Sequence, residues 1–313
     1  MMKNDLSIIM YHYIRDLDNS KYPEIKGLRV TEFDKQLRYI ENNYNLVRMK
    51  DVIAATRNES DLPEKACLLT FDDGYIDHYL TVFPMLHKRG IGGCFFPSSE
   101  VVERKKILDV NKIHFILAGI ASKDFILEFI NHNISKNKDN YDLLSLDEYL
   151  RKYAISNRFD VKEVAYIKTM LQYVLPSKLR DQIICDLFKK YITVDEVGFS
   201  DELYVNSIQL KEMHDNGMFI GNHGAGHKWM NTLDRLEQEK EIDEGLKFLR
   251  RIGGSTQDWV MAFPYGVWDN QLLEVLKQKG CAIGLTTEVG VASLNKANPL
   301  LLPRLDTNDF PKK

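Results

Sequence analysis

Two short stretches of the sequence carry side chains of the types that bind catalytic metals. Asp72 and Asp73 are adjacent in Thr70–Tyr75, and His223 and His227 lie four residues apart with two glycines between them. Two imidazoles and one carboxylate make a three-ligand site that leaves room for water and substrate. Each stretch alone also has an ordinary explanation, because Asp73 could cap a helix and the histidines could be surface or core residues.

The segments that precede these two stretches indicate whether the aspartates and the histidines lie close together in the fold. The apolar run Ala66–Leu69 precedes the aspartates and predicts a buried strand, which Gly74 ends, and Met218–Gly221 is a short predicted strand before the histidines. In a barrel of parallel strands, side chains at the carboxyl ends of the strands share one face. We therefore expect the carboxylates and the histidines to lie at one site.

Two further stretches stand at predicted strand ends. Trp259–Phe263 leads into Pro264–Gly266, a turn whose backbone N–H groups could hold a developing oxyanion. The same turn could simply end a strand. His12 lies near the end of the predicted first strand, Ser7–Tyr13. A histidine there could act as a general acid near neutral pH, or it could be a hydrogen-bonded core residue.

Strand and helix patterns alternate in residues 1–100 and 205–313. This alternation predicts an α/β fold with a mostly parallel sheet, closed or nearly closed into a barrel. One helical pattern there, residues 76–89, contains Pro84 and could be kinked. Residues 101–204 show mostly helical periodicity and are expected to form an insertion. The insertion could be a lid or substrate-recognition element, or a small helical domain that only adds stability.

The bulk composition bears on partners and location. The 313 residues are 44% hydrophobic and carry a net charge of -3, which suits a globular protein and gives no reason to expect nucleic acid as a partner. No apolar run approaches the roughly 20 residues of a membrane-spanning helix. The run Leu6–Met10 is too short for a signal-peptide core. The four cysteines are dispersed, which suits a reducing compartment. We therefore expect a cytoplasmic protein.

Taken together, these stretches resemble the polysaccharide deacetylase family, the NodB-homology group of carbohydrate esterases. Thr70–Gly74 matches the first motif of that family in full. His223–His227 matches its histidine-pair motif, with Gly224 where serine or threonine is usual, and Pro264–Gly266 resembles its third motif. The resemblance covers roughly residues 5–100 and 205–305 and leaves the helical insertion outside.

The resemblance implies a distorted (β/α) barrel of the NodB type that holds one divalent metal ion. Zinc is the first expectation, with cobalt, nickel, manganese and iron as the other candidates. By this resemblance, Asp73, His223 and His227 would hold the metal, and Asp72 would be the general base that deprotonates the attacking water. The metal and the backbone N–H of Tyr265 would stabilise the oxyanion.

The sequence departs from the family pattern in two places. The arginine expected two residues before Pro264 is replaced by Ala262, and no late Leu-x-His supplies a general acid. One branch, similar to the biofilm poly-N-acetylglucosamine deacetylases, begins with a Tyr-His strand and lacks the late histidine. His12 matches that branch, so we assign it as the acid that protonates the leaving amine. Arg304 could replace the missing arginine beside Asp72, or it could be a structural ion-pair residue.

The expected activity is metal-dependent hydrolytic N-deacetylation of an N-acetylated amino sugar. The expected substrate is a nucleotide- or lipid-linked precursor, or a glycan, in the biosynthesis of a cell-surface polysaccharide such as lipopolysaccharide or capsule. One alternative is a deformylase, or another amide hydrolase, on the same scaffold. A second alternative is a catalytically silent glycan-binding protein. The sequence leaves the sugar, its carrier and the oligomeric state open.

Overall fold

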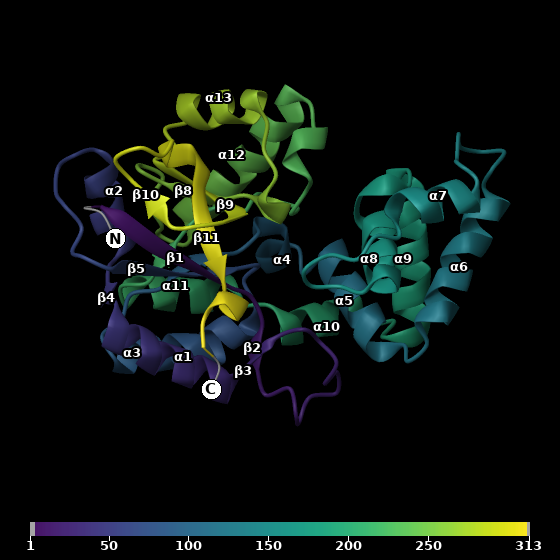
Figure 1. The fold of residues 1–313 in the computed structure, drawn as a ribbon, viewed down its shortest axis with the longest axis horizontal. Helices are drawn as coiled ribbons and strands as arrows, with labels where there is room; N and C mark the ends of the chain where they lie inside the picture. The colour runs from purple at the N-terminus through teal and green to yellow at the C-terminus, as the bar shows by residue number, and fades with distance from the viewer. Residues whose placement is uncertain (1–3, 312–313) are drawn as a thin grey trace. The chain divides into compact units, whose positions relative to one another are not determined.

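A computed structural model describes residues 4–311 of the chain, which form two compact units. The first unit contains the residues up to Asp16, then Gly27–Lys106, and the chain from Ser200 onward. The second unit contains Leu17–Lys26 and Ile107–Phe199. The elements of both units are drawn in Figure 1.

The first unit contains every strand and seven whole helices of the described residues. Its strands are β1 (Asp5–Tyr11), β2 (Ile14–Arg15), β3 (Leu28–Arg29), β4 (Asn45–Leu46), β5 (Ala66–Asp72), β6 (Cys94–Phe96), β7 (Phe219–Ile220), β8 (Val260–Ala262), β9 (Ile283–Val289), β10 (Ala292–Ser293) and β11 (Leu302–Asp306). Its helices are α1 (Val30–Asn43), α2 (Met49–Thr56), α3 (Phe83–Lys88), α4 (Ser99–Glu103), α11 (Ser207–Asp215), α12 (Arg235–Arg251) and α13 (Asn270–Gln278).

The main sheet is parallel and curls back on itself. Its strand order is β7-β6-β5-β1-β11-β9-β8, with β4 added beside β5 and β10 antiparallel to β1. A single bridge between Asn222 and Met261 joins the two edges. There the Asn222 N–H donates to the Val260 carbonyl at 2.9 Å, and the Ala262 N–H donates to the Asn222 carbonyl at 3.0 Å. The expected (β/α) barrel is therefore confirmed.

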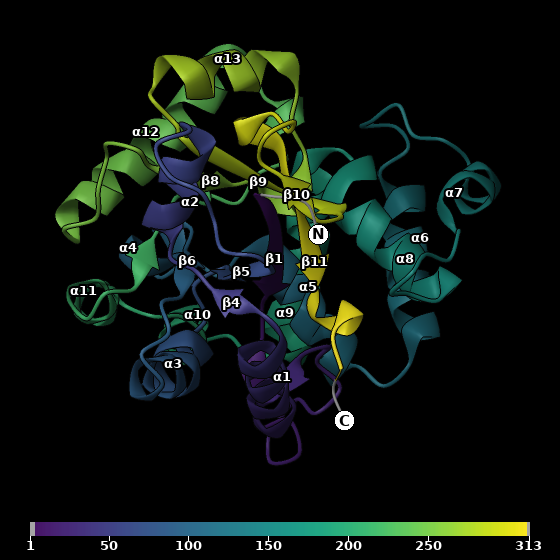
Figure 2. The same ribbon diagram turned by 60° about the vertical axis from the view of Figure 1, so that its left-hand side comes forward.

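Alternation along the strands separates two apolar cores. Ala66 and Leu68 of β5 pack with inward residues of β1, β6, β8, β9 and β11, while Cys67 and Leu69 pack with the helices outside the barrel. Helices α1, α3, α11 and α12 cover this outer face, as Figure 2 shows. Asp72 continues the inward series of β5, so the last residue of this strand places a carboxylate at the mouth of the barrel.

The second unit is helical. It contains α5 (Asp109–Gly119), α6 (Lys123–Lys136), α7 (Leu146–Tyr153), α8 (Lys162–Thr169) and α9 (Ser177–Tyr191), and α10 (Glu196–Leu203) runs along the chain from this unit into the first. Buried isoleucines on one face of α6, at positions 126, 130 and 134, follow the spacing expected of an amphipathic helix. Within residues 4–311, none of the helices has the length and apolar character needed to cross a lipid bilayer.

Candidate active site

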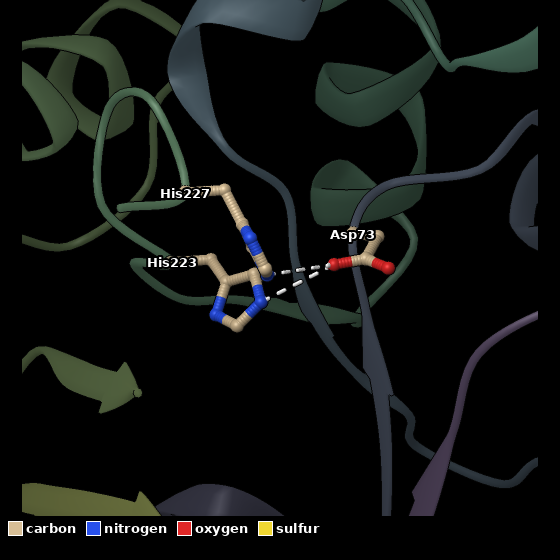
Figure 3. Close-up of side chains that lie close together, drawn as sticks. All are labelled: Asp73, His223 and His227. Carbon is tan, nitrogen blue, oxygen red and sulfur yellow. Dashed lines mark ion pairs between the residues drawn. The ribbon is translucent and has the colours of Figure 1, made fainter. Parts of the chain in front are cut away.

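Asp73, His223 and His227 converge at the carboxyl ends of β5 and β7. Their side chains point toward one another in Figure 3. The Asp73 Oδ1 atom lies 3.3 Å from His223 Nε2 and 3.4 Å from His227 Nε2. One ligand atom from each of the three residues can be chosen so that all lie within 4.8 Å of one another, and all three side chains are buried. The structure thus brings together the three residues that the sequence groups as a candidate metal site.

Neighbouring groups orient two of these side chains. His223 Nδ1 lies 2.7 Å from the Ala262 carbonyl oxygen, to which it donates, so Nε2 presents its lone pair to the site. The Tyr75 hydroxyl donates to Asp73 Oδ2 at 2.5 Å. Asp73 Oδ1 is buried and makes no well-formed hydrogen bond within residues 4–311. A buried carboxylate oxygen with two imidazole nitrogens beside it, and no donor of its own, fits a bound cation.

Three residues of the site have a left-handed backbone. The φ angles are 74° at Asp73, 50° at His227 and 57° at Tyr265. Residues other than glycine rarely adopt this conformation, and it persists where surrounding contacts enforce it, typically at functional sites. The three connections that carry these residues are therefore shaped around the site and are not relaxed.

Burial and charge act in opposite directions on the pKa values of the three candidate metal ligands. Burial raises the pKa of Asp73, but the nearby imidazoles outweigh it and hold that pKa well below its usual range. Burial lowers the pKa of His227 to about 4, so this imidazole is neutral at neutral pH. For His223, burial also lowers the pKa, but Asp73 and Asp72 outweigh it and raise the pKa above its usual value.

Asp72 forms a buried ion pair with Arg304 of β11. Arg304 Nη1 donates to Asp72 Oδ1 at 2.9 Å, and Nη2 lies 2.7 Å from Oδ2. Arg304 Nε also donates to the Thr286 carbonyl at 2.8 Å, which fixes the plane of the guanidinium. Burial alone raises the pKa of Asp72, but the charge and hydrogen bond of Arg304, together with the nearby histidines, outweigh it and lower that pKa. The arginine therefore keeps Asp72 ionised and holds its orientation.

His12 and Tyr265 also lie at this end of the barrel. His12 follows β1 and is half-buried, and its imidazole is near enough to interact electrostatically with Asp72, Asp73 and His227. The Tyr265 ring lies 4.6 Å from the His227 ring in an edge-to-face contact. All seven residues that the sequence singles out are thus located around one site.

Glu241 of α12 is a feature of the site that the sequence analysis missed. Its Oε2 atom accepts hydrogen bonds from the backbone N–H groups of Ala225 (2.9 Å) and Gly226 (2.8 Å), between the two histidines. The side chain is buried. The signal was present, because Glu241 lies on the buried stripe of α12 with Ile242 and Phe248, where an apolar residue is usual.

Comparisons with known sequences find similarity to polysaccharide deacetylases. Residues 181–284 match the family model described as polysaccharide deacetylase. The chain is 25% identical over 289 residues to the polysaccharide deacetylase-like protein YxkH of Bacillus subtilis, covering 92% of this chain and 66% of that protein. It is 34% identical over 84 residues to the poly-beta-1,6-N-acetyl-D-glucosamine N-deacetylase of Escherichia coli K12, covering 26% of this chain and 12% of the enzyme. The chain thus spans about two thirds of the first relative and a small part of the second.

Solved structures share the architecture. The deacetylase PplD of Streptococcus pyogenes superposes with a TM-score of 0.60 at 17% identity, covering 97% of this chain and 93% of PplD. IcaB of Ammonifex degensii gives a TM-score of 0.58 at 17% identity, covering 96% of this chain and 91% of IcaB. At this identity the likeness establishes the fold alone. Residues 181–284 thus match the polysaccharide deacetylase model, and the chain shares the NodB-type barrel fold of these solved structures.

Proposed function

We propose that this protein is a metal-dependent hydrolase that removes the N-acetyl group from an amino sugar. One observation carries the proposal: adjacent aspartates at the end of β5 have separate partners. Asp73 faces the two histidines, and Asp72 faces Arg304. This arrangement supplies a ligand set and a separate ionised base within one buried site.

The donor set fits a divalent ion, since two imidazole nitrogens and one carboxylate oxygen are ligands that catalytic zinc takes. Asp73, His223 and His227 would hold the ion, and zinc is the proposed metal. A cation held there supplies Lewis-acid chemistry, because it polarises the amide carbonyl and acidifies a water enough for a weakly basic carboxylate to deprotonate it.

The other residues move protons and hold charge. Asp72, kept ionised and oriented by Arg304, accepts the proton of the attacking water. His12 donates a proton to the nitrogen of the leaving amine, which otherwise departs as a poor leaving group. The turn at Tyr265 is proposed to donate a backbone N–H to the developing oxyanion.

The substrate class is proposed from the relatives. The similar Escherichia coli protein is a poly-beta-1,6-N-acetyl-D-glucosamine N-deacetylase, which supports an N-acetylated amino sugar here. A role in the biosynthesis of a cell-surface polysaccharide follows from the same class. Whether the sugar is carried on a nucleotide, a lipid or a polymer, whether residues 101–204 recognise that carrier, and whether the protein acts in the cytoplasm all stay predictions.

Acetate release from purified protein tests the proposal. The substrates are N-acetylglucosamine oligomers, UDP-N-acetylglucosamine and a lipid-linked N-acetylated sugar, with the protein stripped by dipicolinate and reloaded with one metal at a time. Activity that depends on added metal supports the proposal. Release of formate from the N-formylated analogue of the same sugar, detected by mass, with no acetate from the acetylated sugar, identifies the deformylase alternative. Stoichiometric metal binding without turnover on any acylated sugar would favour the silent glycan-binding protein.

A further inference from the structure

The connection between α7 and α8 of the helical unit holds large apolar side chains in water. We call residues 150–162 the α7–α8 segment; it runs from the last turn of α7 to the first residue of α8 (Figure 1). Ile155 and Val161 are each 65% exposed, and Phe159 is 50% exposed. Single exposed apolar residues are common, but three of them within seven positions form a patch that needs an explanation.

The backbone of the segment is anchored while these side chains remain outside. Asp160 is buried and forms ion pairs of 2.8 Å with both Lys26 and Lys168. Asn157 Oδ1 accepts hydrogen bonds from the backbone N–H groups of Phe159 (2.8 Å) and Asp160 (2.9 Å). The exposure of Phe159 therefore belongs to a loop with a defined conformation, in which the acid points in and its apolar neighbours point out.

The exposed charged side chains of the segment are basic. Arg151, Lys152, Arg158 and Lys162 are all exposed. Asp160 is the one acid between positions 150 and 162 of the sequence, and two lysines from outside the segment already neutralise it. The nearest other acids in the sequence, at 148 and 163, lie beyond its ends. Exposed basic side chains thus lie beside the apolar patch along the chain.

We propose that the α7–α8 segment docks the protein on an anionic phospholipid surface. Apolar side chains that enter the headgroup region, with lysine and arginine beside them, are the combination that binds anionic bilayers. Lysine is depleted at protein–protein interfaces, so Lys152 and Lys162 favour a lipid surface over a protein partner. The inference rests on the helical unit alone and does not depend on the proposed deacetylase activity.

Vesicle sedimentation with the full chain tests this proposal. We expect the wild type to pellet with vesicles of 30% phosphatidylglycerol in phosphatidylcholine at least tenfold more strongly than with phosphatidylcholine alone. The triple variant Ile155→Ser, Phe159→Ser, Val161→Ser should lose at least tenfold in binding to the anionic vesicles. Ile208→Ser is the matched control, because Ile208 is 78% exposed on α11 of the first unit, and it should bind like the wild type.

A second measurement separates insertion from simple charge attraction. A Phe159→Trp variant should show fluorescence quenched by brominated phosphatidylglycerol vesicles beyond the quenching of the wild type, whose three tryptophans all lie in the first unit. Equal pelleting with neutral and anionic vesicles, or unchanged pelleting of the triple variant with a wild-type circular dichroism melt, overturns the proposal. Failure of the wild type to pellet also overturns it and leaves a protein partner as the occupant of the patch.

Discussion

Arg304 and Asp72 face each other through two nitrogen–oxygen contacts of 2.9 and 2.7 Å, both side chains being buried inside the barrel. The arginine comes from β11, whereas the family pattern places an arginine two residues before Pro264, where this chain has Ala262. A different strand therefore supplies the positive charge. A guanidinium reaches both oxygens of a carboxylate at once, which a lysine cannot do.

Replacing Arg304 should alter both stability and pH dependence. Arg304→Gln leaves Asp72 buried without its counter-charge, and we expect unfolding in urea to show a loss of about 3–5 kcal/mol. The pKa of Asp72 should rise because the charge that lowers it is gone. The acidic limb of the kcat/KM profile should then move to higher pH, since the base is protonated over more of the range. An unmoved acidic limb would show that Asp72 is not the base that this limb reports.

Asp72→Asn should separate metal binding from turnover. The amide keeps the shape of the side chain but cannot accept a proton, so we expect kcat to fall by about 10²–10⁴-fold. Bound metal, measured by atomic emission, should stay at the wild-type stoichiometry because Asp72 lies outside the proposed ligand set. His223→Ala is the comparison and should lose the metal. Wild-type turnover by Asp72→Asn would remove this residue from the mechanism.

His12→Asn tests the proposed general acid through the leaving group. Amide hydrolysis needs a proton on the departing nitrogen, so deacetylation of N-acetylglucosamine oligomers should fall by about 10²–10⁴-fold. Hydrolysis of 4-nitrophenyl acetate should fall by less than about tenfold, because nitrophenolate leaves without protonation. Equal losses on the amide and the ester would assign His12 a different role.

Glu241→Leu should weaken metal binding although Glu241 lies outside the ligand set. The variant leaves the Ala225 and Gly226 N–H groups without their acceptor, so the loop between the histidines loses its shape. We expect the zinc affinity, measured by competition with a chromogenic chelator, to fall by about 10–100-fold.

Two variants control the Glu241 experiment. Glu241→Gln keeps an acceptor oxygen and should restore most of the affinity. Glu244→Leu changes a partly exposed acid on the same helix and should leave zinc binding unchanged. Equal affinity in Glu241→Leu and wild type would contradict a positioning role.

Asp160 should make the helical unit sensitive to acid. Burial raises the pKa of Asp160, but hydrogen bonds from Lys168 and Lys26 outweigh it, so its folded pKa lies below the usual value. The stabilisation is therefore present above about pH 4, the pKa of an unfolded aspartate, and is lost as the pH falls through the folded pKa. Amide exchange of residues 154–170 should be faster in Asp160→Asn than in wild type at pH 6, and this difference should shrink below about pH 4. Asp142→Asn is the control and should exchange like the wild type. If Asp160→Asn and wild type differ in exchange rate by the same amount at all pH values, or do not differ at all, the prediction is wrong.

The grouping of residues that are distant in the sequence was predictable because polar residues follow an apolar strand. The seven residues of β5 are all buried, so an apolar run followed by two aspartates marks both the strand and its mouth. Parallel pairing then brings the strand ends together without any need for exact bounds. This is why the grouping of Asp73 with His223 and His227 could be made from the sequence.

Local geometry was harder to predict where one residue breaks a regular pattern. Residues 76–89 carry one helical pattern, but the structure has a π-helical turn at His78–Val82 before α3 begins at Phe83. Pro84 lacks an N–H group, so it falls in the first turn of a helix, where no such group is needed. The role of Glu241 was hidden for another reason, because its partners are backbone N–H groups that no side-chain motif records.

The position of β1 between β5 and β11 has a consequence for how the protein is made. Asp72 leaves the ribosome 232 residues before Arg304, an interval of roughly tens of seconds at bacterial synthesis rates. During that time β1 and β5 are available to pair, but the carboxylate at their end has no counter-charge. This end of the sheet therefore stays exposed to water until β11 pairs with β1. The active site is then the last part of the barrel to form.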